Sequence, residues 1–247
     1  MTQNGCEERI IIALDVATVA EAVALTQELA PWVSRFKVGL ELYSVAGPEA
    51  VRAVQAAGAE KVFLDLKLHD IPNTVRNAAR AAAALGVEFI TVHASGGVEM
   101  MRAAVAGAAE GGSAKILAVT VLTSLGAHSA YHIYRREISE AVWQFAVDAG
   151  QAGCWGIICS PQELAFLPER IRGEAVGARD VATLKFITPG VRPAWAAAND
   201  QQRVMTPGEA IRHGAYALVI GRPITRPPTS IGSPVDAARR IISELPE

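Results

Sequence analysis

The chain alternates between short β-branched segments and Ala-rich segments of helical period, and no other feature constrains its fold as strongly. Each strand-like segment is followed by a helix-like segment, and several of the latter end at glycine, as at Gly58, Gly86 and Gly214. The predicted strands are residues 9–16, 35–40, 61–68, 88–94, 115–123, 155–160, 183–190 and 216–222. Eight strand–helix units are the number that closes a parallel barrel, so we expect an α/β fold, a (β/α)8 TIM barrel.

The domain organisation follows from the chain length and from the absence of a linker in the sequence. At 247 residues the chain has the length at which such barrels commonly form one domain. No Ser/Gly-rich or low-complexity segment divides it. We therefore expect residues 1–247 to form a single barrel domain, with the active site at the C-terminal ends of the strands.

Composition argues against several classes of function. The formal net charge is −2 and no basic stripe is present, which disfavours nucleic-acid binding. Apolar runs such as residues 217–220 are far shorter than the roughly 20 residues that span a bilayer, so no membrane helix is expected. The polar N-terminus lacks a signal-peptide pattern, which predicts a cytoplasmic location. The three cysteines lack CxxC spacing, so we expect neither a disulfide nor a zinc site.

Charged residues interrupt one predicted strand, in the stretch KVFLDLKLHDIPNTV at 61–75. Asp65 and Lys67 lie within the apolar run, and Asp70 follows it. Side chains alternate along a strand, so Asp65 and Lys67 should share the inward face, and Asp15 should reach the same mouth by the same parity. Burying ions is costly, so such a cluster is either paired for structure or arranged for chemistry.

Other polar residues close the remaining strands, where the site of such a barrel is expected. Lys37 lies in the second strand–helix unit, and Thr123 is the last residue of the fifth predicted strand. The last two strands end in TPGVRP and IGRP, where Gly221 lets the backbone approach a ligand and Arg222 offers a planar set of donors. Loops at these positions often hold a phosphate, so we expect an anion site there.

The motifs that contain these polar residues are similar to those of a known family. The stretch DLKLHDIPNTV at 65–75 resembles the signature of the orotidine 5′-phosphate decarboxylase family, of bacterial type. Further matching motifs occur in family order over residues 9–226: ALDV at 13–16, KVG at 37–39, TVHA at 91–94, VLTS at 121–124, CSPQE at 159–163, TPGVRP at 188–193 and IGRPIT at 220–225. Residues 169–183 and 226–234 look longer than the compact bacterial pattern, and neither segment overlaps a matched motif.

The resemblance implies a reaction and the residues that perform it. It implies a carboxy-lyase of pyrimidine biosynthesis that converts orotidine 5′-phosphate to UMP and CO2, with no metal and no cofactor. Lys67 would stabilise a carbanion at C6 of the pyrimidine and then protonate it. Lys37, Asp65 and Asp70 would complete a charged array around it.

The resemblance also implies substrate contacts and a partner. Asp15 and Lys37 would contact the ribose, and Thr123 the pyrimidine. Gln201, Gly221 and Arg222 would bind the phosphate, with Arg192 beside them. The protein would be a homodimer in which Asp70 and Thr74 reach into the active site of the partner subunit.

Two alternatives remain open from the residues. One is a Mg²⁺-dependent decarboxylase or aldolase of the same barrel superfamily that acts on a sugar phosphate, since such relatives share a DxKxxD core. The other is a non-catalytic barrel that binds nucleotides. The motifs LHDIPNT and TPGVRP resemble the orotidine 5′-phosphate decarboxylase family and so favour it over both alternatives.

Overall fold

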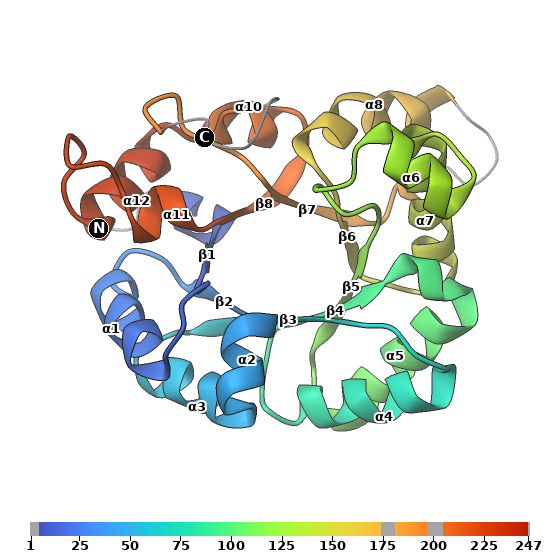
Figure 1. The fold of residues 1–247 in the computed structure, drawn as a ribbon, viewed down its shortest axis with the longest axis horizontal. Helices are drawn as coiled ribbons and strands as arrows, with labels where there is room; N and C mark the ends of the chain where they lie inside the picture. The colour runs from blue at the N-terminus through green and yellow to red at the C-terminus, as the bar shows by residue number, and fades with distance from the viewer. Residues whose placement is uncertain (1–4, 174–180, 197–204, 247) are drawn as a thin grey trace. The chain divides into compact units, whose positions relative to one another are not determined.

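The computed structural model describes residues 5–173, 181–196 and 205–246. Its eight strands follow one another in the order β1 to β8 and close into a barrel (Figure 1). The pairs β1–β2, β1–β8, β2–β3, β4–β5, β5–β6 and β6–β7 are parallel, which confirms the predicted (β/α)8 fold. The strands are β1 (Ile10–Ala13), β2 (Arg35–Gly39), β3 (Lys61–Leu68), β4 (Phe89–His93), β5 (Lys115–Val119), β6 (Gly156–Ile158), β7 (Lys185–Pro189) and β8 (Ala215–Ile220).

Helices separate consecutive strands, as the sequence pattern predicts. The α-helices are α1 (Val19–Leu29), α2 (Leu40–Ala46), α3 (Pro48–Ala56), α4 (Pro72–Ala83), α5 (Gly97–Gly111), α6 (Ala127–Tyr134), α7 (Ile138–Gln151), α8 (Pro161–Gly173), α10 (Pro207–Arg212), α11 (Arg222–Thr225) and α12 (Pro234–Ser243). Two 3-10 helices, η1 (Cys6–Arg9) and η2 (Ala94–Gly96), complete the described elements. Gly58, Gly86 and Gly214 have φ angles of 111°, 74° and 98°, so the predicted left-handed helix ends are present.

The chain groups into two compact units. Unit 1 comprises Met1–Asp65 and Thr188–Glu247, and unit 2 comprises Leu66–Ile187. In unit 1, β1 pairs with β2 and with β8, so both of its edges are occupied. Ile10, Ile11 and Ile12 are fully buried, as expected for a strand covered on both faces. That residues 1–247 form a single domain stays a prediction.

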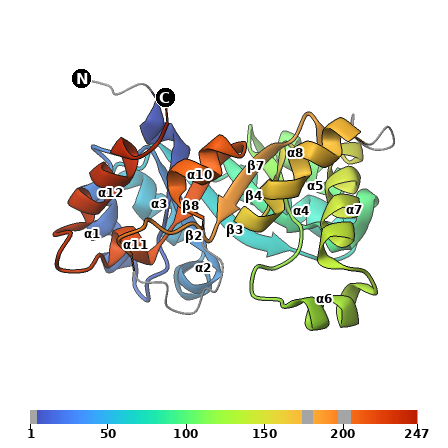
Figure 2. The same ribbon diagram turned by 90° about the horizontal axis from the view of Figure 1, so that it is seen from above.

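Unit 2 contains a very close contact between two helices. An added Cβ at Gly107 or Gly111 of α5 would lie 2.1 Å from the carbonyl oxygen of Arg76 or Arg80, respectively, on α4. The two glycines lie one turn apart, so the backbones of the helices meet directly along this edge. Helix α6 is set apart from the strands of its unit (Figure 2).

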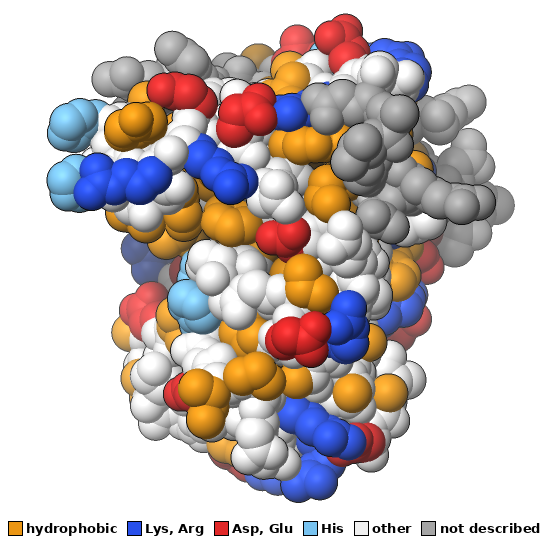
Figure 3. Space-filling model, turned by 90° about the vertical axis from the view of Figure 1, so that its right-hand side faces the viewer, with side chains coloured by type: hydrophobic (Ala, Val, Ile, Leu, Met, Phe, Trp, Pro, Cys, Tyr) orange, Lys and Arg blue, Asp and Glu red, His pale blue; other side chains and the backbone are white. Residues whose placement is uncertain are grey.

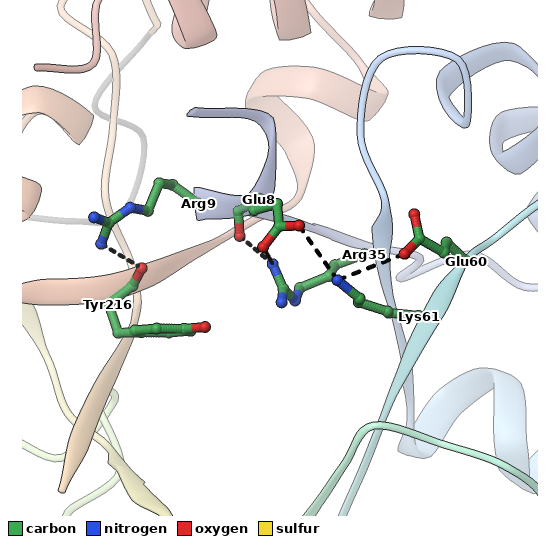
Figure 4. Close-up of polar contacts among 6 residues, drawn as sticks. All are labelled: Glu8, Arg9, Arg35, Glu60, Lys61 and Tyr216. Carbon is green, nitrogen blue, oxygen red and sulfur yellow. Dashed lines mark hydrogen bonds and ion pairs between the residues drawn. The ribbon is translucent and has the colours of Figure 1, made fainter. Parts of the chain in front are cut away.

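A polar cluster ties together the N-terminal ends of β1, β2, β3 and β8 in unit 1 (Figure 4). Arg9 donates a hydrogen bond to the carbonyl of Tyr216 at 3.1 Å. Arg35, the first residue of β2, binds the carbonyl and the carboxylate of Glu8. Lys61, the first residue of β3, lies 3.4 Å from Glu8 and 3.6 Å from Glu60. Polar groups at the N-terminal ends of the strands stabilise such a barrel, whereas active sites lie at the C-terminal ends of the strands.

The sequence pattern does not predict the three helices α2, α6 and α11. Helix α2 precedes α3 in the second strand–helix repeat, α6 precedes α7 in the fifth, and α11 follows β8 in the eighth. Each of these helices buries few side chains: Leu42 in α2, Ala130 in α6, and Pro223 and Ile224 in α11. The helix-like segments that follow the predicted strands form the other α-helices. Of the segment 226–234, residues 226–233 form the loop between α11 and α12 and Pro234 begins α12, whereas part of 169–183 lies outside the described residues.

The surface carries charges of both signs. On the face drawn in Figure 3, Lys and Arg side chains are interspersed with Asp and Glu side chains. Within the described ranges, no helix combines the length and the apolar character needed to cross a membrane.

Candidate active site

Three of the predicted site residues meet at the C-terminal ends of β1, β2 and β3 in unit 1. The Lys37 ammonium donates a hydrogen bond to Asp15 Oδ1 at 2.9 Å and lies 3.6 Å from Asp65 Oδ2. Lys37 and Asp65 are buried, whereas Asp15 is exposed. Asp15 lies two residues beyond β1, in the loop rather than in the strand. One ammonium therefore bridges two carboxylates, which offsets the cost of burying Lys37 and Asp65.

Gly39 makes room for this ammonium. An added Cβ at Gly39 would lie 2.8 Å from the Lys37 Nζ and 3.5 Å from Asp15 Oδ1. Any larger residue would displace the ammonium from between its two carboxylates. The motif KVG contains this glycine, yet the sequence alone does not reveal that it serves a neighbouring side chain.

Lys67 has an unusual backbone. Its φ angle is 51°, although it lies within β3. Its N–H donates a hydrogen bond to the hydroxyl of Thr91 at 2.9 Å. Non-glycine residues in this region are strained, and such strain concentrates at functional sites. The inward direction expected for the Lys67 side chain was based on the alternation of side chains along a strand, which assumes an extended backbone. That rule does not apply to a residue with a positive φ angle.

Asp70 and Thr74 are both exposed in unit 2. Asp70 Oδ1 accepts a hydrogen bond from the N–H of Ile71 at 2.6 Å, next to the first residue of α4. The Ile71 side chain, next to Asp70 in the sequence, is also exposed.

Glu163 forms a buried polar cluster at the ends of β5 and β6 that was not predicted. Its Oε2 accepts a hydrogen bond from the N–H of Ser160 at 2.8 Å and one from the hydroxyl of Thr120 at 3.4 Å. Thr120 also donates to the carbonyl of Ile158 at 3.0 Å. The cluster thus anchors the start of the loop that carries Thr123, which is itself exposed. The S-x-x-E spacing at 160–163 is a capping-box pattern that could have signalled it.

Burial raises the pKa of the Glu163 carboxyl to about 7, although its hydrogen bonds to Ser160 and Thr120 act in the opposite direction. The folded protein therefore holds this proton more tightly than the unfolded chain does. Its contribution to stability is present at low pH and decreases as the pH rises from about 4.5 to about 7.

We expect Glu163→Gln to reduce this pH dependence, because the amide stays neutral at every pH. Between pH 5 and pH 8 the wild-type protein should lose up to about 3 kcal/mol more unfolding free energy than the variant. Urea unfolding of both proteins at the two pH values measures the difference. The control is Glu209→Gln: hydrogen bonds from Thr206 lower the pKa of Glu209, so this carboxyl is ionised in the folded and unfolded states over this pH range, and its substitution should leave the pH dependence unchanged. If the unfolding free energies of wild type and Glu163→Gln depended equally on pH, the raised pKa of Glu163 would be contradicted.

The predicted phosphate-site residues lie in unit 1, apart from Gln201, which is outside the described residues. Gly221 and Arg222 directly follow β8, at the start of α11. Arg222 is exposed, whereas Arg192 is buried, and the Arg192 N–H donates to the carbonyl of Met205 at 3.0 Å. An added Cβ at Gly221 would make only ordinary contacts, 3.5 Å from Ala13 Cβ and 3.7 Å from Asp15 Oδ2. Packing within the protein thus does not require glycine there.

Acidic residues, histidines and cysteines do not cluster as metal ligands in the described part of the chain. No group of three or more such side chains is placed to hold an ion among those residues. Cys6, Cys154 and Cys159 are free thiols in the structure.

The fold and these residues define a class: a (β/α)8-barrel protein with lysines and aspartates at the C-terminal ends of its first strands. Comparison with known proteins identifies the family within this class. The sequence model of the "Orotidine 5'-phosphate decarboxylase / HUMPS family" matches residues 8–241. The chain belongs to this family.

Individual relatives agree with this assignment. The orotidine 5′-phosphate decarboxylase of Moorella thermoacetica is 45% identical over 253 aligned positions, which cover 99% of this chain and 95% of the relative. That of an Anaeromyxobacter strain is 49% identical, with 96% and 98% covered. The crystal structure of the Lactobacillus acidophilus enzyme superimposes with a TM-score of 0.79 at 35% identity, covering 97% of this chain and 100% of that one.

Proposed function

We propose that this protein is a carboxy-lyase that decarboxylates orotidine 5′-phosphate to UMP in pyrimidine biosynthesis. The observation that carries the proposal is the DLKLHD segment at 65–70, which begins in β3 and whose Lys67 has a strained backbone. Relatives that share 45% and 49% of its residues over nearly the whole chain are named for this reaction. We also propose that the protein acts in the cytoplasm, as expected from the sequence.

The chemistry explains why such residues are needed. Loss of CO2 from C6 leaves an electron pair in the ring plane, where no adjacent group can delocalise it. The barrier therefore falls only if the protein stabilises that charge more in the transition state than in the substrate. In our proposal the Lys67 ammonium stabilises the developing carbanion and then transfers a proton to C6. The C6–carboxylate bond breaks, the C6–H bond forms, and CO2 leaves.

The aspartates have separate roles in the proposal. Asp65, two residues before Lys67 on β3, faces the substrate carboxylate and disfavours the bound substrate until CO2 departs. Asp15 and Lys37, which form a hydrogen bond at 2.9 Å, bind the ribose hydroxyls as one preorganised unit. Thr123 would contact the pyrimidine from the loop after β5.

The phosphate would bind at Gly221 and Arg222, with Gln201 and Arg192 beside them. Packing does not require glycine at position 221. In our proposal, its missing side chain leaves space for the phosphate to approach the backbone closely. The phosphate is remote from C6, so its binding energy would orient the ring rather than change the chemistry.

We expect Arg222→Ala to weaken UMP binding by about 10- to 100-fold, because a charge-assisted hydrogen bond to the phosphate is lost. Titration calorimetry with UMP measures this loss. The matched control is Arg226→Ala, which removes an exposed arginine four residues further on and should bind UMP normally. An unchanged affinity in Arg222→Ala would disprove the role of this residue.

We further propose that two copies of the chain form a homodimer in which Asp70 and Thr74 complete the partner's site. The exposure of Asp70, Ile71 and Thr74 supports this, because a second copy of the chain can contact these side chains only if they lie at the surface. Mixing Lys67→Ala with Asp70→Asn subunits would then restore part of the activity, since one site of each mixed dimer is intact.

The reaction is tested by mixing purified protein with orotidine 5′-phosphate in EDTA and following the loss of orotate absorbance. We expect decay in EDTA, without stimulation by added Mg²⁺. Decay that requires Mg²⁺ would favour the metal-dependent branch of the superfamily. UMP binding without any decay would favour a non-catalytic nucleotide-binding barrel.

A further inference from the structure

The backbone of Lys67 is held in a conformation that a strand residue does not adopt by itself. Among the described residues other than glycine, only Lys67 and Arg135 have positive φ angles. Arg135 ends helix α6, where a left-handed residue is common. Lys67 instead lies one residue before the end of β3. Its conformation therefore needs a local cause, because such strain persists only where the surroundings impose it.

The local cause is the side chain of Thr91. The Thr91 hydroxyl accepts the hydrogen bond from the Lys67 N–H at 2.9 Å. A left-handed residue departs from regular strand geometry, so the partly buried N–H of Lys67 needs an acceptor outside the regular strand pattern. Without the hydroxyl, the N–H would lose its partner in a partly buried place.

Thr91 is itself firmly placed. Its side chain is fully buried on β4, and all five residues of β4 are in register with β5, with Thr91 opposite Leu117. A β-branched side chain has few rotamers, which keeps its hydroxyl in one direction. The acceptor is therefore preorganised by a neighbouring strand pair rather than by Lys67.

We propose that Thr91 is a positioning residue for Lys67. Its hydroxyl keeps the Lys67 backbone left-handed and so determines the direction in which the Lys67 side chain leaves the strand. Thr91 does not touch the substrate in this proposal. The inference rests on the proposed function, because it assigns the purpose of this geometry to proton delivery at C6. Small displacements of a catalytic group reduce rates strongly, so the hydrogen bond should matter for turnover.

Three variants test the inference. Thr91→Val keeps the shape but removes the acceptor, and Thr91→Ser keeps the hydroxyl. Thr26→Val is the matched control, because Thr26 is also fully buried and its hydroxyl donates to the carbonyl of Ala22 at 2.7 Å on α1. We expect kcat to fall about 10- to 100-fold in Thr91→Val, with KM within about twofold of wild type. Thr91→Ser should retain most of the activity, and Thr26→Val should lose stability only.

The outcomes separate this inference from the proposed function. A wild-type kcat in Thr91→Val, or an equal loss in Thr26→Val, would overturn the positioning role. If the wild-type protein does not decarboxylate the substrate, the proposed function fails. The positioning role is then decided by the crystal structure of Thr91→Val, where a Lys67 φ that remains near its wild-type value would overturn it.

A second measurement covers the case in which Thr91→Val does not fold. In the wild-type protein, hydrogen exchange at the Lys67 amide should be slowed at least about 100-fold relative to an unprotected amide. Exchange as fast as that of an exposed loop amide would overturn the inference.

Discussion

Lys67→Ala is expected to abolish measurable turnover of orotidine 5′-phosphate while the protein remains folded. The substitution removes both the cation that stabilises the C6 carbanion and the acid that protonates it. Each of these effects is commonly worth at least about 100-fold, so kcat should fall by at least about 10,000-fold. Alanine tolerates a positive φ no better than lysine does, so the backbone strain remains and the experiment reports on the side chain. Steady-state assays and circular dichroism check the two parts of this result.

Lys61→Ala is the matched control for this variant. Lys61 is the first residue of the same strand, and its ion pairs are made with Glu8 and Glu60 at the N-terminal end of the barrel. Its loss should lower stability by at most about 1 kcal/mol, because exposed ion pairs contribute little, and should leave kcat unchanged. Near-normal activity in Lys67→Ala would remove this residue from the mechanism.

Gly107→Ala is expected to cause the largest loss of stability. A Cβ at this position would lie 2.1 Å from the Arg76 carbonyl oxygen, which belongs to the backbone of α4 and cannot rotate away. The helices must separate, at a cost of about 3 kcal/mol or more in unfolding free energy. This loss should exceed the gain of about 1 kcal/mol that alanine brings in helix propensity. Urea unfolding measures the net effect.

Gly126→Ala is the control for this substitution. An added Cβ at Gly126 has no neighbour within 4 Å among the described atoms, and its φ is negative, so stability should change by less than about 1 kcal/mol. If Gly107→Ala were as stable as wild type, α4 and α5 would not meet as closely as described. Since α4 begins two residues after Asp70, a shift of this helix should also lower activity.

The barrel could be predicted from the sequence because its signals are local. A strand buried on both faces needs a continuous apolar run, as at Ile10–Ala13, and a parallel connection needs a helix between strands. Helices α2 and α6 escaped prediction because they extend the loops and carry little of the core, so their periodicity is weak.

The candidate site was predictable only in part. Asp15, Lys37 and Asp65 were singled out as charges at strand ends, and the structure brings them together around one ammonium. The role of Gly39 could not be predicted, because it depends on the space that the Lys37 side chain occupies in the folded protein. The roles of Thr91 and Glu163 depend on contacts with distant residues, Lys67 and Thr120, which no local pattern encodes.

The most direct measurement of the central claim is proton NMR of the product formed from orotidine 5′-phosphate in D2O with EDTA. If Lys67 protonates a C6 carbanion, the product is UMP with one deuterium at C6, formed in the same amount as CO2, because the lysine protons exchange with solvent. The same experiment with Lys67→Ala should yield no product. Substrate that remains intact with the wild-type protein, or UMP formed equally well by Lys67→Ala, would contradict the account.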